Sequence, residues 1–337
     1  MFKFNFNVET EDQSEPMAEE PTDDPSAEKG HSETPRDWLP AQCHEINQEH
    51  LNFLTDGCVV EEVTIGETGV KYISMSSALE KMEQTEVSTN IVPAFQDHTD
   101  LVPAVYEGGL KIWECTWDLL DHLSSMKMNM NGCRVLELGC GAALPGLYAA
   151  LQGAHVSLQD YNEEVIRYIT IPNAVLNLAD SSSLVIDEEG TIDCKFSESS
   201  VKQVAERVSF FSGDWSGLER KLLMQNPHEN SEVKLAKNAN TSSSESDCGE
   251  LKFDVILTSE TIYNTDCYEK LLHVMTSCLK RNGIIILAAK THYFGVGGGT
   301  QQFINFVKKH DQLEVKSFVA NSQGLKREIL EMRFKNK

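Results

Sequence analysis

A turn with two closely spaced glycines and one carboxylate is the stretch of this sequence best suited to chemistry. The run VLELGCGAAL occupies residues 135–144, with Glu137 two positions before Gly139 and Gly141 two positions after it. Small residues after a strand let a ligand approach the backbone and the start of the next helix. A dinucleotide-binding turn has its third glycine three residues after the second, but here the next glycine is Gly146. The turn therefore favours a cationic cofactor without phosphate, such as S-adenosylmethionine; a purely structural turn is the alternative.

Acidic and aromatic residues stand together at the ends of the next two predicted strands. Asp160 and Tyr161 follow HVSLQ, and Asp214 and Trp215 follow ERVSFFSG. Because parallel strands end at one edge of a sheet, we expect these side chains to face one crevice. There Asp160 would accept the ribose hydroxyls, Tyr161 would pack on adenine and Asp214 would lie near the purine amino group. Each Asp taken alone is also a common helix cap.

The fourth predicted strand ends in TSETIYN, where an open α/β sheet places the groups that react. Its candidate side chains are Ser259, Glu260, Tyr263 and Asn264. Glu260 and Asn264 are the catalytic candidates from this strand end.

A glycine-rich segment, KTHYFGVGGGTQ, follows the fifth predicted strand. We expect the glycines of residues 295–299 to form a mobile lid, with an ordinary solvated turn as the alternative. His292 is the third catalytic candidate, since the segment brings it and Tyr293 to the predicted lid.

The elements that must position these residues alternate between short apolar runs and helical segments. This rhythm predicts an α/β fold, a Rossmann-like, mostly parallel sheet with helices on both faces. Trp113, Trp117, Leu120 and Leu123 recur at helical spacing and predict a helix before the first core strand. The predicted strands are CRVLEL, HVSLQD, ERVSFFSGDW, KFDVILTSE and GIIILAAK, followed by an antiparallel pair of LEVKSFVA and REILEMRF.

The chain divides into three parts by composition. Residues 1–38 form an acidic tail that we expect to be disordered, because it lacks large apolar residues over most of its length. Residues 39–104 form an N-terminal extension with a hairpin around GETG, and residues 105–337 form the main domain. Two polar insertions, residues 180–200 and 228–250, are predicted to be solvated loops.

Composition limits the partners and the compartment. The net charge of −23 argues against a nucleic-acid partner and favours a basic protein, because opposite charges raise encounter rates. Nine scattered cysteines without a C-x-x-C pair indicate a reducing compartment. We expect no membrane span and no metal, since the histidines of HEINQEH are six residues apart and diverge around a helix.

Six strings together resemble the histidine protein methyltransferases of the seven-β-strand superfamily. They are VYEGGLKIWECTWDLL, VLELGCGAALPG, LQDYN, FFSGDW, LTSETIYN and KTHYFGVGGG, spread from residue 105 to residue 299. The resemblance implies a seven-stranded class I methyltransferase fold that uses S-adenosylmethionine. The cofactor contacts that it implies are Ile112, Trp113, Glu114, Cys115, Thr116, Gly139, Gln159, Asp160, Tyr161, Gly213, Asp214, Trp215 and Ser259, to which the glycine turn adds Glu137 and Gly141.

The resemblance also implies methyl transfer to the tele (tau) nitrogen of a histidine in a large-subunit ribosomal protein. A neutral imidazole, with a pKa of about 6.5, already has a free lone pair, so positioning is the main requirement. Glu260, Asn264 or Tyr263 would accept the other ring N–H and fix the tautomer, and His292 or Tyr293 would close over the ring. Methylation of lysine is the leading alternative, and a non-catalytic chaperone for a ribosomal protein is the second; a nicotinamide oxidoreductase ranks third. We expect a monomer in the cytoplasm and nucleus, the nucleolus included.

Overall fold

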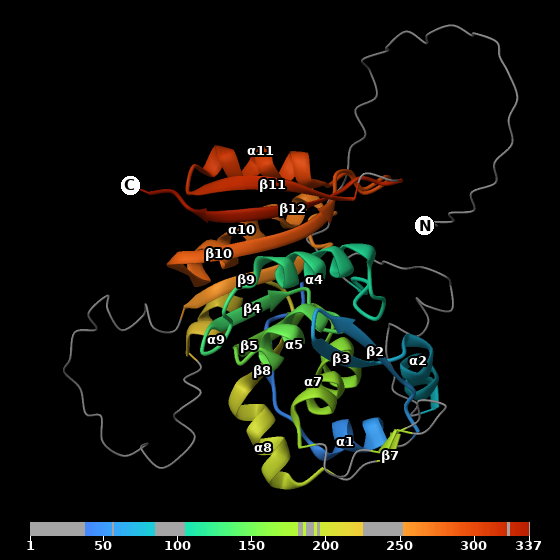
Figure 1. Cartoon of the computed structure of the whole chain (residues 1–337). Helices are drawn as coiled ribbons and strands as arrows, with labels where there is room; N and C mark the ends of the chain where they lie inside the picture. Colours follow the sequence, from blue (N-terminus) through green and yellow to red (C-terminus); the bar gives the residue numbers. More distant parts are fainter. Residues whose placement is uncertain are drawn as a thin grey trace, which may run out of the picture.

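A single mixed sheet forms the centre of the computed structural model (Figure 1). The structure describes residues 38–55, 57–84, 105–180, 185–186, 192–193, 196–224, 252–321 and 324–336. Residues 1–37 of the predicted tail (1–38), the insertion at 228–250 and part of that at 180–200 therefore lie outside the described residues. The sheet has eight strands in the order β1-β8-β5-β4-β9-β10-β12-β11.

The five predicted core strands are confirmed and run parallel. They are β4 (Arg134–Leu138), β5 (His155–Asp160), β8 (Val208–Ser212), β9 (Phe253–Ser259) and β10 (Leu279–Lys290). The predicted antiparallel pair is also confirmed, as β11 (Leu313–Asn321) against β12 (Arg327–Phe334), with β12 antiparallel to β10. The α/β class and the seven-strand core thus stand as predicted.

An eighth strand was missed. β1 (Gln42–His44) pairs antiparallel with the free edge of β8. Three residues are too few to show a period of two, so no sequence pattern marked this strand. It brings the N-terminal extension to the same edge of the sheet as the end of β8.

Helices cover both faces of the sheet, as predicted, because neighbouring residues of each strand point to opposite sides. Val135 packs in the core with α4 (Glu114–Met126), α5 (Leu144–Leu151), α7 (Ile171–Leu178) and α8 (Glu198–Arg207). Leu136 faces the other core, with α9 (Leu218–Met224), α10 (Tyr268–Cys278) and α11 (Thr300–His310). Short turns of α6 (Glu163–Val165), η1 (Ile166–Thr170) and η2 (Thr265–Cys267) complete these layers.

The predicted hairpin of the N-terminal extension is confirmed as β2 (Val60–Ile65) and β3 (Thr68–Ile73). Figure 1 shows it beside α2 (Met75–Gln84), whereas α1 (Gln48–Thr55) packs against α7. The two-residue strands β6 (Val185–Ile186) and β7 (Ile192–Asp193) form a second small pair. The buried Asn173 joins hairpin and core, since its Oδ1 accepts from Ile73 N at 2.9 Å and its Nδ2 donates to Ala142 O at 3.1 Å. The hairpin is thereby tied to the glycine turn.

The strand order places a ligand site between β4 and β9. From β4 the chain builds outward to β5 and β8, then returns to add β9 and β10 on the other side. Ligands of open α/β sheets bind outside the carboxyl ends of the strands at such a reversal. Among the described residues, no helix is both long and apolar enough to span a membrane.

Candidate active site

A cavity opens where β4, β5, β8 and β9 end. Its lining residues are Trp38, Glu107, Gly108, Gly109, Lys111, Ile112, Trp113, Thr116, residues 139–144, Gln159, Asp160, Tyr161, Gly213, Asp214, Trp215, residues 259–261, Tyr263 and Cys267. The predicted cofactor residues line it except Glu114, Cys115 and Glu137. The three strand ends and the glycine turn therefore do face one crevice.

The glycine turn is held by side chains of the neighbouring strand β5. Gly139 N donates to Gln159 Oε1 at 3.3 Å, and Gly141 N donates to Asp160 Oδ2 at 2.9 Å. Gly141 has a φ of 51°, and a Cβ there would lie 2.8 Å from Gly109 O. Glycine is needed because the segment that carries Gly109 crosses directly over the turn.

Asp160 is buried at the centre of the cavity wall. Burial raises the pKa of its carboxyl to about 6, although hydrogen bonds from backbone N–H groups, that of Gly141 first, oppose this rise. Oδ1 also accepts from Asn162 N at 3.3 Å. A carboxylate with an oxygen bonded to the glycine turn is well placed to accept further hydrogen bonds from a sugar bound there.

Glu137 does not face the cavity, which corrects its predicted contact with a cationic cofactor. Its side chain is buried on the α5 side of β4, and Oε2 accepts from Gly146 N at 2.8 Å. Burial raises the pKa of this carboxyl to about 8, opposed by the Gly146 hydrogen bond and supported by the charge of Asp160. Its role is to fix the start of α5 behind the glycine turn.

The raised pKa of Glu137 predicts a pH-dependent stability. A buried acid that binds its proton more tightly in the folded state loses stability as pH rises, here from about 4.5 to about 8. Glu137→Gln keeps an acceptor for Gly146 N without the charge. We expect its free energy of unfolding, relative to wild type, to rise by about 3.5 kcal/mol between pH 5 and pH 8 in urea titrations.

Exposed Glu206 offers the matched control, because Glu206→Gln removes the same charge from the surface of α8. Equal pH dependence of Glu137→Gln and wild type would contradict the assignment.

Aromatic rings and amides form the part of the cavity wall at the ends of β5 and β8. Trp215 Nε1 donates to Gln159 Oε1 at 2.8 Å, and Gln159 Nε2 donates to Gly213 O at 2.9 Å. Tyr161 OH accepts from Leu39 N at 3.3 Å, so the segment before β1 lies against this ring. The ring and the amide network leave a flat, polar-edged wall of the kind a purine stacks on.

Trp38 is a cavity residue that the sequence analysis assigned to the tail. Its ring meets Tyr161 edge to face with centroids 6.0 Å apart, and Lys270 Nζ lies 3.4 Å from its ring centroid. Lys270 Nζ also lies 2.9 Å from Asp214 Oδ1, so the Asp214 carboxylate in the cavity wall is paired with a cation. The start of an apolar run at WLPA, directly after the acidic tail, was the available signal.

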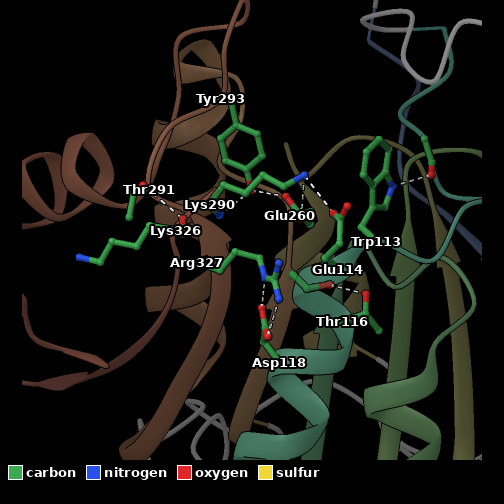
Figure 2. Close-up of polar contacts among 12 residues, drawn as sticks. Trp113, Glu114, Thr116, Asp118, Glu260, Lys290, Thr291, Tyr293, Lys326 and Arg327 are labelled. Carbon is green, nitrogen blue, oxygen red and sulfur yellow. Dashed lines mark hydrogen bonds and ion pairs between the residues drawn. The ribbon is translucent and has the colours of Figure 1, made fainter. Parts of the chain in front are cut away.

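Glu260 also lines the cavity, and Figure 2 shows its contacts with Tyr293 and Lys290. It is buried with a φ of 56°, a left-handed backbone that a side-chain-bearing residue seldom adopts. Tyr293 OH donates to Oε2, and Lys290 Nζ lies 3.4 Å from Oε1. Among the described residues, Oε1 has no hydrogen-bond partner. Strain and an incompletely bonded buried carboxylate together are typical of a functional position.

The segment before α4 covers the part of the cavity that Glu260 lines. Trp113 Nε1 donates to Gly108 O at 3.1 Å, and the Trp113 ring lies 5.3 Å from Lys290 Nζ. Tyr263 OH donates to the carboxylate of Glu107, and burial together with that charge raises the pKa of Tyr263 well above its usual value. Tyr263 is therefore a neutral hydroxyl near neutral pH.

Several predicted residues lie outside the cavity lining. Glu114 turns to Lys290, with Oε2 3.1 Å from Nζ, and Cys115 is fully buried beside Glu260. Asn264 caps η2 by accepting from Asp266 N at 3.0 Å. His292 packs against the exposed Phe294 ring, with centroids 4.7 Å apart. In this structure the geometry favours Glu260 alone of the three catalytic candidates, and the roles of Asn264 and His292 remain untested.

The glycine-rich segment is packed at its C-terminal half. Gly298 N donates to Tyr263 O at 3.0 Å, and a Cβ at Gly298 would lie 2.1 Å from Ile262 O. Gly299 N donates to Tyr268 OH at 3.1 Å. These glycines let the loop approach the end of β9, which is a structural reason for the run besides the predicted lid.

The donor set fits S-adenosylmethionine. The cavity offers a buried carboxylate beside the glycine turn, an aromatic wall at one end and aromatic and acidic groups at the other, and Glu260 Oε1 has no hydrogen-bond partner among the described residues. Within the same residues no group of three His, Cys, Asp or Glu side chains is placed to hold a metal ion. The strand order and the cavity define a class I methyltransferase that uses S-adenosylmethionine.

Proteins of similar sequence have names that agree with this class. The Bos taurus protein named histidine protein methyltransferase 1 homolog is 36% identical over 329 residues, covering 94% of this chain and 81% of its own length. The Schizosaccharomyces pombe histidine protein methyltransferase 1 is 30% identical over 290 residues, 79% and 77% of the two chains. A family model described as lysine methyltransferase matches residues 217–310. The chain belongs to the histidine protein methyltransferase 1 family.

Among solved structures, a TehB-like SAM-dependent methyltransferase from Corynebacterium glutamicum is similar with a TM-score of 0.38 and 15% identity. The match covers 77% of this chain and 100% of that one.

Proposed function

We propose that this chain transfers the methyl group of S-adenosylmethionine to the tele (tau) nitrogen of a histidine in a large-subunit ribosomal protein. The observation that carries the proposal is Glu260, a buried carboxylate in the cavity wall with one oxygen that has no hydrogen-bond partner among the described residues. Membership of a family whose relatives are named histidine protein methyltransferases supports the choice of histidine.

Glu260 would act by accepting the N–H of the pros nitrogen. That hydrogen bond fixes the tautomer in which the tele nitrogen has a free lone pair. The tele nitrogen then forms a bond to the methyl carbon as the carbon–sulfur bond breaks and its electron pair returns to sulfur. The ring gains positive charge in this step, and the Glu260 carboxylate stabilises that charge and receives the pros proton afterwards.

The residues around Glu260 would hold the reacting groups and exclude water. Tyr293 OH fixes one carboxylate oxygen, and the pKa of Tyr293 is held well above its usual value by burial and by Glu260. Trp113 and Tyr263 supply apolar walls at the same end of the cavity. S-adenosylmethionine, when bound, supplies the electrophilic methyl group, so positioning accounts for most of the catalysis.

A basic ribosomal protein suits the charge of this chain, which is −23. The proposal places the enzyme, as a monomer, in the nucleus with its nucleolus and in the cytoplasm, where such proteins are assembled and used. Lysine methylation is the second candidate, favoured by the description of the matching family model.

Mass spectrometry of methylated ribosomes tests the proposal. Large ribosomal subunits from cells without their own histidine methylation are incubated with the full chain and isotope-labelled S-adenosylmethionine, then digested. We expect label on one histidine, and amino-acid analysis to identify tele-methylhistidine. Label on lysine would favour the second candidate, whereas cofactor binding without any labelled protein would favour a non-catalytic role.

A further inference from the structure

We propose that Lys290 is a positioning residue that holds the Glu260 carboxylate as an ion pair and so makes the site select a neutral imidazole over an ammonium group. The inference rests on the proposed function, in which Glu260 contacts the substrate ring. Lys290 is not among the cavity-lining residues, so it acts through Glu260.

Lys290 lies between two carboxylates (Figure 2). Its Nζ is 3.4 Å from Glu260 Oε1 and 3.1 Å from Glu114 Oε2, and it faces the Trp113 ring at 5.3 Å. The side chains of Lys290 and Glu260 are only 13% and 7% exposed, whereas that of Glu114 is 58% exposed. Solvent screens the pair with Glu114, so the pair with Glu260 is the buried one.

The neighbouring charges stabilise the ammonium form of Lys290. Burial lowers the pKa of Lys290, but Glu260 and Glu114 outweigh it, and the net pKa is raised. The ionisable groups facing the pair from the packed elements are Glu114, Cys115 and Asp118 on α4, Arg327 on β12 and Tyr293 in the loop after β10. Burial and the Glu260 charge raise the pKa of Cys115, so this thiol adds no charge. Asp118 is itself paired with Arg327.

A paired carboxylate discriminates between the two substrates. A substrate ammonium group loses its hydration in the site and needs a carboxylate that is not already paired with another cation. Glu260 is already paired with Lys290. A neutral imidazole needs only one acceptor for its N–H, and Oε1 of Glu260 can accept that hydrogen bond.

Lys290→Met tests the pairing and Lys290→Arg restores the charge. The probe is the recombinant ribosomal protein whose histidine is labelled in the experiment above. With S-adenosylmethionine held saturating at every pH, kcat/KM for the protein substrate should fall on the acid side as the substrate imidazole protonates, near pH 6.5, for wild type and Lys290→Arg alike. For Lys290→Met we expect this acid limb to move upward by about one pH unit or more, because the buried carboxylate then has no cation beside it.

Selectivity supplies the second readout. The same ribosomal protein with lysine in place of its target histidine is offered at pH 9. We expect the ratio of lysine to histidine methylation to rise about tenfold or more in Lys290→Met, since the ionised Glu260 has lost its cation. Lys326→Met is the matched control, because Lys326 pairs with Glu328 and not with Glu260.

Calorimetric titration with S-adenosylmethionine checks that each variant is folded, and Lys290→Gln replaces Lys290→Met if that variant does not bind. The inference would be overturned if a cofactor-binding variant of Lys290 matched wild type in both the acid limb and the ratio of lysine to histidine methylation. A change of either quantity in Lys326→Met would also overturn it. If wild type labels no histidine at all, the proposed function fails, and that outcome is distinct from the failure of Lys290.

Discussion

Glu260→Ala is expected to lower kcat about 1,000-fold and to leave the affinity for S-adenosylmethionine within about twofold of wild type. The loss follows from removing the acceptor that selects the tautomer and stabilises the positive charge on the ring. Affinity should persist because the glycine turn, Asp160 and the aromatic wall lie at other strand ends. Alanine is as strained as glutamate at a φ of 56°, so the substitution adds no backbone strain of its own.

Two measurements are needed: single-turnover methylation of the ribosomal protein and calorimetric titration with the cofactor. Tyr293→Phe is the graded control, since it removes one hydrogen bond to Glu260 and keeps the carboxylate. We expect it to cost about tenfold in kcat. Turnover of Glu260→Ala equal to that of wild type would remove Glu260 from the reaction.

The parallel core was predictable from the sequence because each strand is a short apolar run that ends in small or acidic residues. Leu136 and Val135 face opposite cores, so both had to be apolar, and the continuous run was the signal for a strand covered on both faces. The end of each run then marked the wall of the cavity, and Asp160 and Trp215 were found in this way. The apolar runs therefore indicated the position of the cavity as well as the strands of the sheet.

The rest depended on contacts between distant segments, which spacing does not encode. Glu137 has the position of a ligand-facing carboxylate, yet its side chain lies on the α5 face of β4 because odd-numbered residues of that strand point there. Trp38 reaches the cavity only because β1 adds to the edge of β8, 168 positions away along the chain from His44 to Ser212. Lys290 looks like the end of an ordinary strand, and only the fold brings it to Glu260.

Asp160→Asn is expected to weaken S-adenosylmethionine binding about 100-fold, because hydrogen bonds from hydroxyls to a charged acceptor contribute about 1.5–3 kcal/mol each. Asparagine keeps an oxygen that can accept from Gly141 N, so the glycine turn should hold its shape and the loss should reflect the cofactor. Asp266→Asn, an exposed change of the same charge on η2 outside the cavity lining, should bind as wild type does.

The pH dependence of binding separates a lost charge from a distorted loop. With the pKa of Asp160 raised to about 6 in the free protein, binding to the ionised form must displace a proton at lower pH. The wild-type affinity should therefore fall as pH drops below about 6, approaching tenfold per unit, while the α-amino group of the cofactor, with a pKa of about 8, stays charged. Asp160→Asn should show a flat profile over the same range in calorimetric titrations. A wild-type affinity that does not change between pH 7 and pH 5 would mean that the ionised carboxylate of Asp160 does not hold the cofactor.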